Sequence, residues 1–402
     1  MQEGRFPVTA ICTSTLELGI DIGKVKSIAQ IGVANSVSGL RQRLGRSGRR
    51  NEPSILRILS IDGERGLLDE LRTNLFQNIA VVELLKEHQF ETSSINNYHF
   101  STLIQQLLSL IVSYESILAK EAWQYLCMNG IFNNVTSSVF LKLLHCLGEK
   151  KVISQLHTGE IIIGWVGEKI IRDIDFYATF MRTDDYTILD INGGRIGIIQ
   201  GEPRKGDIIK LAAKHWKVEE VSKRNKTAYV HQTDKIGNLF FDGFGMEASP
   251  FIVEKMKEVY CSLDEYPYLD MNAKTQLKVG RNYFSQYALD STSFIEYNER
   301  NTLFTWAGYR INHTIELILK QYLEDIEIEE CNAIYIVGVT PSDISFVLKQ
   351  EKPKAVDLAS LLVFELKLQY KYDYLLTDEL LNMEYAKSCL DIDGAWNILG
   401  NV

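Results

Sequence analysis

The sequence lacks the features that mark several common classes of protein. Its six cysteines are scattered over 402 residues without a C-x-x-C pair, which argues against a disulfide framework and against a structural metal site. No apolar run reaches the roughly 18–20 residues that a membrane helix needs, and the first residues lack the apolar core of a signal peptide. We therefore expect a cytoplasmic protein with reduced thiols, no metal site and no membrane partner.

Flexible and strongly charged segments are also scarce. Seven prolines and no low-complexity segment leave no candidate for a flexible tether, and 46% hydrophobic residues are enough for a sizeable core. A chain of this length suggests two to four domains.

The net charge is −9, yet residues 1–60 hold nine Lys/Arg and four Asp/Glu, so the remainder carries −14. A basic head on an acidic body indicates local contact with a polyanion.

Two stretches near the N-terminus carry the strongest functional signal. Residues 11–23 read ICTSTLELGIDIG, and residues 42–50 read QRLGRSGRR. Guanidinium groups suit phosphate oxygens, and the intervening glycines let the backbone approach a ligand closely. Arg46 and Arg49 are three residues apart, so one helical turn would aim both at a transferring phosphoryl group. Asp21 could bond a ribose hydroxyl or hold an arginine. The alternative is a solvated basic face on a surface helix.

The elements around these stretches predict a parallel α/β sheet. Residues 8–12, 27–33 and 54–61 are expected as strands, and residues 38–46 as a helix capped by Ser36 or Ser38. In such sheets, ligands bind at the carboxyl ends of the strands. Three strands are too few for a complete doubly wound domain, so this part is predicted to be partial.

The middle of the chain predicts two further modules after a helical connector at residues 63–98. Residues 99–166 combine three amphipathic helices with a hairpin, the pattern of a winged helix, whose third helix would present Thr136, Ser137, Lys142 and His145. Winged helices read nucleic acid, but they also serve as packing spacers, and both possibilities stay open. Residues 167–250 predict an antiparallel sheet or small barrel, with a turn at Asn192-Gly193. Residues 251–402 predict a mixed α+β C-terminal domain.

With the whole order in view, the chain resembles a superfamily-2 helicase of the large helicase-related (Lhr) family. The segment TSTLELGIDIG is similar to helicase motif V, and QRLGRSGR is similar to motif VI. The following winged helix, the G-D-I-I-K-L and H-W-K-V strands and F-T-W-A-G-Y-R-I-N extend the resemblance over nearly the full chain. The resemblance implies a fold with a RecA-like domain at residues 1–62 and an ATP-driven helicase or translocase acting on single-stranded DNA, DNA or RNA–DNA duplex, in DNA repair or defence.

The resemblance also implies roles for individual residues of the two motifs. Thr13 and Ser14 would contact the nucleic-acid backbone, while Gly19 and Asp21 would couple that contact to the nucleotide. Four residues of motif VI would face the ATP phosphates: Gln42, Arg43, Arg46 and Arg49. Arg46 and Arg49 are the candidate arginine fingers.

The chain departs from the family pattern in one respect. It contains no G-x-x-x-x-G-K-[ST] phosphate loop and no D-E-x-H-like segment. We therefore predict a C-terminal helicase part, truncated before motif V, that is not ATPase-competent alone. ATP and Mg²⁺ would be held mainly by an N-terminal motor half on the same or a separate polypeptide. The alternatives are a non-enzymatic nucleic-acid-binding module or adaptor, built on the winged helix and β domain, and an inert fragment.

Overall fold

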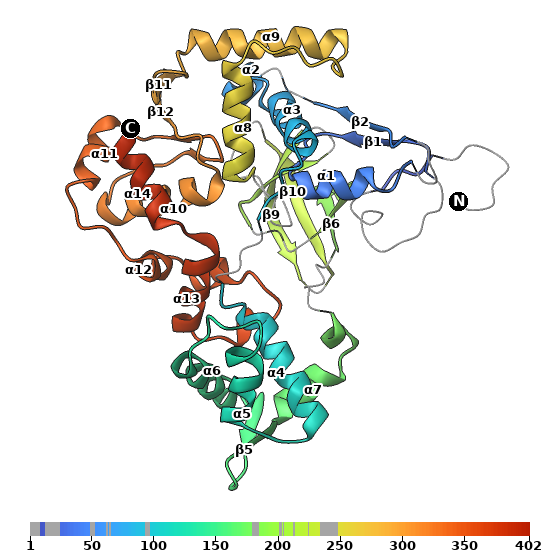
Figure 1. The fold of residues 1–402 in the computed structure, drawn as a ribbon, viewed down its shortest axis with the longest axis vertical. Helices are drawn as coiled ribbons and strands as arrows, with labels where there is room; N and C mark the ends of the chain where they lie inside the picture. Colours follow the sequence, from blue (N-terminus) through green and yellow to red (C-terminus); the bar gives the residue numbers. More distant parts are fainter. Residues whose placement is uncertain are drawn as a thin grey trace, which may run out of the picture. The chain divides into compact units, whose positions relative to one another are not determined.

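A computed structural model describes residues 9–12, 25–48, 53–61, 63, 66–92, 97–178, 185–200, 203, 205–211, 214–223, 225–233 and 248–402. The chain divides into two compact units, each built from segments that are not consecutive. Unit 1 comprises residues 1–93, 244–350 and 394–402, and unit 2 comprises residues 94–243 and 351–393 (Figure 1). These units do not follow the five consecutive segments predicted from the sequence, because long-range packing joins distant parts of the chain.

The N-terminal part of unit 1 is a parallel α/β element. Strand β1 (Ile28–Ile31) pairs in parallel with β2 (Leu56–Leu59), and α1 (Val37–Leu44) connects them. The two strands, the helix and the Ser36 cap confirm the prediction for this part. The predicted strand at residues 8–12 is not formed by its described residues 9–12. Helices α2 (Leu67–Glu70) and α3 (Thr73–Lys86) follow.

The second part of unit 1 comes from residues beyond 248. Helices α8 (Pro250–Cys261) and α9 (Met271–Gln286) precede a sheet of four strands in the order β11-β12-β14-β13. These strands span Phe294–Tyr297, Arg300–Phe304, Tyr335–Val337 and Glu330–Cys331 in that order. Helices α10 (Tyr309–Tyr322) and α11 (Pro341–Val347) complete this part, together with most of α14 (Ile392–Asn401).

One hydrophobic core joins these two parts of unit 1. It contains Leu40 of α1, Phe76 of α3, Met256 of α8 and Phe284 of α9. The rings of Phe76 and Tyr260 stack with centroids 3.6 Å apart, and the Tyr260 hydroxyl donates to the Leu71 carbonyl. In Figure 1, α3 and α8 lie side by side. Because burial of apolar area is the main stabilising contribution, the N-terminal sheet and the α8–α9 region form one structural unit.

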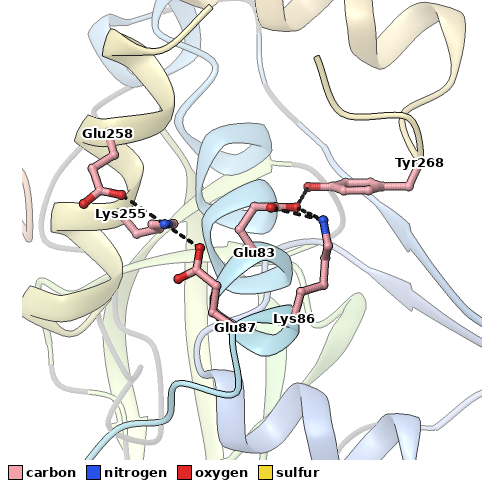
Figure 2. A network of polar contacts seen from close by, with 6 residues as sticks. All are labelled: Glu83, Lys86, Glu87, Lys255, Glu258 and Tyr268. Carbon is pink, nitrogen blue, oxygen red and sulfur yellow. Dashed lines mark hydrogen bonds and ion pairs between the residues drawn. The ribbon is translucent and has the colours of Figure 1, made fainter. Parts of the chain in front are cut away.

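A polar network on α3 reinforces this packing (Figure 2). The Lys255 ammonium on α8 lies 2.8 Å from Glu87 and 3.0 Å from Glu258. Glu83 accepts from Lys86 and, at 2.9 Å, from the hydroxyl of Tyr268. Burial and the bond to Glu83 raise the pKa of Tyr268, so it stays protonated and remains a donor. The network therefore ties α3 both to α8 and to the loop before α9.

The helical part of unit 2 contains the three predicted helices and the predicted hairpin in the expected order. Its elements are α4 (Phe100–Tyr114), α5 (Ala119–Trp123) with a π-helical turn (Gln124–Met128), α6 (Ser137–Glu149), β4 (Ile153–Gln155), β5 (Glu160–Ile163) and α7 (Trp165–Arg172). A short strand missed from the sequence, β3 (Ile117–Leu118), pairs with β5. The order of these elements agrees with the expected one, and the winged helix itself stays a prediction.

The C-terminal segment completes the core of this helical part. Helices α12 (Ala355–Ser360) and α13 (Asp378–Cys389) belong to unit 2. Leu375, Leu376, Leu380 and Leu381 lie in the same buried cluster as apolar residues of α4 and α6. The predicted C-terminal domain, residues 251–402, is therefore shared between the two units.

A five-stranded sheet forms the other part of unit 2. Its strands are β6 (Asp185–Asp190), β7 (Arg195–Gln200), β8 (Ile208–Leu211), β9 (Lys214–Ser222) and β10 (Thr227–Gln232). Their order is β7-β6-β10-β9-β8, and Gly193 makes the predicted turn with φ +85°. A Cβ at Gly197 of β7 would lie 2.8 Å from Leu211 of β8, so the two edge strands approach each other.

One pair of strands differs from the antiparallel pairing expected for a sheet or small barrel. Strand β10 pairs with β6 in parallel, while the other three pairs are antiparallel. The reason is geometric: consecutive strands of an up-and-down sheet alternate in direction, so the first and fifth strands run the same way. When the sheet curls and these two meet, their pairing must be parallel.

Within the described part of the chain, no helix combines the length and apolar character that crossing a membrane requires.

Candidate functional site

Helix α1 leaves the sheet where ligands of parallel α/β proteins bind. It follows β1 after a short loop, and that loop begins at the carboxyl end of the strand. The helix carries Gln42 and Arg43 in its last turn, and Arg46 follows directly after its end. Gln42 is exposed, whereas Arg43 and Arg46 are half-buried. Because α1 starts at the carboxyl ends of the strands and runs back, Arg46 lies near their amino ends, beside Ser47, which bridges to Val25 before β1 and accepts from Ile55 N before β2.

The N-terminus of α1 is held by a carboxylate from a distant part of the chain. Glu91 accepts from the backbone N–H of Val37 at 2.6 Å and of Ser38 at 3.1 Å, and from the Ser38 hydroxyl at 2.8 Å. The Ser36 side chain accepts from Gly39 N at 3.1 Å. Burial acts to raise the pKa of Glu91, but these hydrogen bonds outweigh it and lower that pKa. Glu91 is thus a charged cap at the positive end of the helix dipole.

The loop between β1 and α1 is held by α3. The Asn78 amide accepts from Ala34 N at 2.8 Å and donates to the Gly32 carbonyl at 3.2 Å and to Ser60 at 2.6 Å. Gln77 donates to the Ala34 carbonyl. Asn78 is buried, so its loss would leave these backbone groups without partners. Two side chains of α3 therefore hold the loop through its backbone groups.

Arg43 makes a contact within its own domain. Its Nη1 donates to Oε1 of Gln30 on β1 at 2.7 Å, and Gln30 donates in turn to the Val33 carbonyl at 2.9 Å. Gln30 is buried at the point where β1 faces α1. A guanidinium bound to a buried amide fixes the distance between helix and strand. This is the geometry of a packing contact, which the prediction of a phosphate role for Arg43 did not foresee.

The chain turns sharply after α1. Ser47 is buried, its hydroxyl donates to the Leu44 carbonyl at 3.1 Å and accepts from Ile55 N at 3.2 Å, and Val25 bridges to it in parallel. Gly48 has φ +70°, a conformation that side chains disfavour, which explains a glycine at this position. The turn that carries Arg46 and Ser47 is therefore held by several hydrogen bonds.

Five predicted site residues lie outside the described residues: Thr13, Ser14, Gly19, Asp21 and Arg49. Their roles stay predictions. Among the described residues, no three His, Cys, Asp or Glu side chains gather closely enough to hold a metal ion. The described part of this site thus offers cations and amides, which suit phosphate oxygens.

Sequence reasoning missed Gln30, Asn78 and Glu91. Glu91 lies 53 residues from its Ser38 partner, and nothing in the local pattern around it marks a helix cap. Gln30 sits in an apolar strand, where a single polar residue could have signalled a buried partner.

Two of the four residues predicted on the reading face of α6 in unit 2 have partners within the chain. Thr136 caps the helix by accepting from Val139 N, and Lys142 lies 2.5 Å from Glu379 of α13. Lys150 donates to the carbonyls of Tyr374 and Leu376. Ser137 and His145 are exposed. The one lysine among the four predicted residues is therefore paired with a carboxylate.

The chain is similar to parts of known helicases. Residues 1–51 match the model of the helicase conserved C-terminal domain. The chain is 25% identical to an ATP-dependent helicase Lhr-Core from Methanocaldococcus jannaschii, over 90% of this chain and 44% of that protein. The chain is therefore similar to part of an Lhr-like helicase.

Two further relatives are a second helicase sequence and a solved helicase structure. Over 45 residues, 11% of the chain and 4% of the relative, it is 53% identical to an ATP-dependent helicase hrq1 from Schizosaccharomyces pombe. The structure of Mycobacterium smegmatis helicase Lhr bound to ssDNA and AMP-PNP aligns with a TM-score of 0.55 and 14% identity, covering 96% of this chain and 55% of that one. At that identity the likeness supports the fold alone. The chain spans about half the length of the two Lhr proteins that it matches, 44% of one and 55% of the other.

Proposed function

We propose that this chain supplies the C-terminal portion of an ATP-dependent nucleic-acid helicase or translocase. Arg46 and Arg49 would act as arginine fingers in an ATP site whose phosphate loop lies on another segment. The carrying observation is that α1 is clamped at its N-terminus by Glu91 and carries the described arginines of the motif, Arg43 and Arg46, at its other end. The Mycobacterium smegmatis relative bound to ssDNA and AMP-PNP supports nucleotide and single-stranded DNA as the ligands.

The chemistry asked of the arginines is charge stabilisation. As the γ-phosphoryl group is transferred, negative charge spreads over its oxygens, and a guanidinium placed beside them stabilises that charge. The site residues described here include no carboxylate cluster, so Mg²⁺ would be held by the segment that carries the phosphate loop. The chain alone would then bind ATP weakly and would not hydrolyse it.

The exposed face of the N-terminal sheet supports the need for a further segment. Ile31 is 70% exposed and Leu59 52% exposed, and both lie on the same outward face of β1 and β2. Parallel sheets are normally covered on both faces. We infer that this face packs against the remainder of a RecA-like motor, on the same or a separate polypeptide. Cytoplasmic location and action on DNA or RNA–DNA duplex belong to the same proposal.

The test is ATP hydrolysis with and without a motor half that carries the phosphate loop. The chain alone should show no DNA-stimulated hydrolysis, and the combined protein should show it. Arg46→Ala should reduce kcat by about 10³-fold or more, the range attributed to arginine fingers. Arg172→Ala, an exposed arginine on α7 of unit 2, is the matched control and should leave kcat unchanged. DNA-stimulated hydrolysis by the chain alone that Arg46→Ala abolishes would overturn the proposal.

The adaptor alternative draws less support from the described residues. Lys142 is paired with Glu379, and Lys150 is bound to backbone carbonyls, so α6 offers few free donors to phosphate.

A further inference from the structure

We propose that Glu91, Gln30 and Arg43 are positioning residues that hold α1 at two points and thereby aim Arg46 at the nucleotide. This inference rests on the proposed function. It assigns Arg43 to the support of the site and not to phosphate contact.

The first point of attachment is the N-terminus of α1. A single carboxylate accepts three hydrogen bonds there, from Val37 N, Ser38 N and the Ser38 hydroxyl, at 2.6–3.1 Å. Two consecutive backbone groups bound to the two oxygens of one carboxylate fix the direction of the helix axis as well as its position. Because Glu91 follows α3, the attachment links α1 to the helix that carries the core residue Phe76.

The second point of attachment is the last turn of α1. Arg43 reaches Gln30 at 2.7 Å, and Gln30 is itself fixed by its bond to Val33. Val37 and Arg43 are six residues apart, which corresponds to a rise of about 9 Å along the helix. Two attachments at that separation restrict both tilt and rotation of α1.

Arg46 lies one turn beyond Arg43, and its backbone N–H donates to the Arg43 carbonyl at 2.9 Å. A shift in the backbone at Arg43 would therefore move Arg46 as well. A catalytic group misplaced by about 1 Å can lose on the order of 10²-fold in rate. Residues that hold the helix should for this reason affect the chemical step more than substrate binding.

Arg43 itself has the contacts of a supporting residue. It is half-buried, and its guanidinium bonds to a neutral buried amide. If Arg43 were a phosphate ligand, releasing it from Gln30 would do no harm. If it is a positioning residue, removing Gln30 should be nearly as harmful as removing Arg43.

The experiment measures kcat and KM for ATP in the protein combined with the motor half. Glu91→Ala, Gln30→Ala and Arg43→Gln should each lower kcat roughly 10-fold or more, with KM within about twofold of the parent. Glu87→Gln is the matched control, because Glu87 lies near Glu91 in sequence but contacts Lys255 of α8.

A second readout does not depend on the activity. In the chain alone, Glu91→Ala should accelerate amide hydrogen exchange at Val37 and Ser38, and Glu87→Gln should not. Any of three results would overturn the inference. They are unchanged exchange in Glu91→Ala, an unchanged kcat in Gln30→Ala, and a raised KM with normal kcat in Arg43→Gln. If Arg46→Ala leaves hydrolysis intact, the proposed function fails; if Arg46→Ala abolishes hydrolysis but the three variants do not impair it, only the positioning inference fails.

Discussion

At the scale of single residues, two buried carboxyl groups stand out in unit 2. Glu384 accepts from His99 N at 3.3 Å and Phe100 N at 3.2 Å, so it caps the start of α4. Asp373 is fully buried and accepts from Gln369 N and Tyr370 N. Burial raises the pKa of Asp373 to about 6, and burial together with the charge of Asp373 raises the pKa of Glu384 to about 7.

These raised pKa values predict a stability that falls with rising pH. The folded state holds its carboxyl protons up to about pH 6–7, whereas an unfolded chain releases them near pH 4, the usual carboxyl range. The folded state therefore binds more protons between these values, and the free energy of unfolding of unit 2 decreases as pH rises through this window. We expect the melting temperature of unit 2 to be lower at pH 8 than at pH 5.

The variant Glu384→Gln isolates this effect, because an amide cannot ionise. Its melting temperature should change less between pH 5 and pH 8 than that of the parent. Glu379→Gln, at an exposed position on the same helix, serves as the control and should keep the parent's pH dependence. Equal pH dependence in the Glu384→Gln variant and the parent would contradict the assignment.

At the scale of elements, the close approach of α9 to α2 and α3 depends on a position without a side chain. A Cβ at Gly280 would lie 2.7 Å from the Leu71 carbonyl oxygen and would also collide with the ring of Phe76. The backbone oxygen accepts the Tyr260 hydroxyl and has little freedom to move. The sequence around Gly280 predicts only a helix, and it gives no sign of this contact.

The substitution Gly280→Ala should therefore destabilise unit 1, although alanine favours helices. Overpacking of this kind costs about 1–3 kcal/mol. Chemical denaturation monitored by tryptophan fluorescence would report the loss, since Trp306 lies in the same core. Gly148→Ala on α6 is the matched control, because a Cβ there meets nothing within 4 Å. A Gly280→Ala variant as stable as the parent would show that α9 can shift without penalty.

At the scale of the whole molecule, each unit has its own hydrophobic core. Phe76 belongs to the cluster of unit 1, and Phe140 to the cluster of the helical part of unit 2. Both side chains are almost fully buried. Separate cores that share no residue allow separate unfolding transitions.

We expect Phe76→Ala and Phe140→Ala to act on different transitions in calorimetry. Truncation of a buried phenylalanine costs about 3–5 kcal/mol. Phe76→Ala should lower the transition of unit 1, and Phe140→Ala that of unit 2, each leaving the other near its parental temperature. A single transition lowered by both variants would mean that the two units unfold as one.

The sequence by itself determined the features that depend on neighbours along the chain. The Ser36 cap, helix α1, the Asn192-Gly193 turn and the strands on either side of them follow from local spacing, because caps and tight turns are made by residues a few positions apart. The two motifs near the N-terminus also indicated the resemblance to helicases, since both are short and contiguous.

Only the tertiary structure decided the contacts that join distant segments. Glu91 reaches α1 across 53 residues, and Glu384 reaches α4 across 284, while the C-terminal segment supplies part of the core of unit 2. The parallel pairing of β6 with β10 likewise appears only when the sheet curls. Such contacts arise from the shape of the packed chain, and no short-range pattern encodes which of many polar side chains will meet.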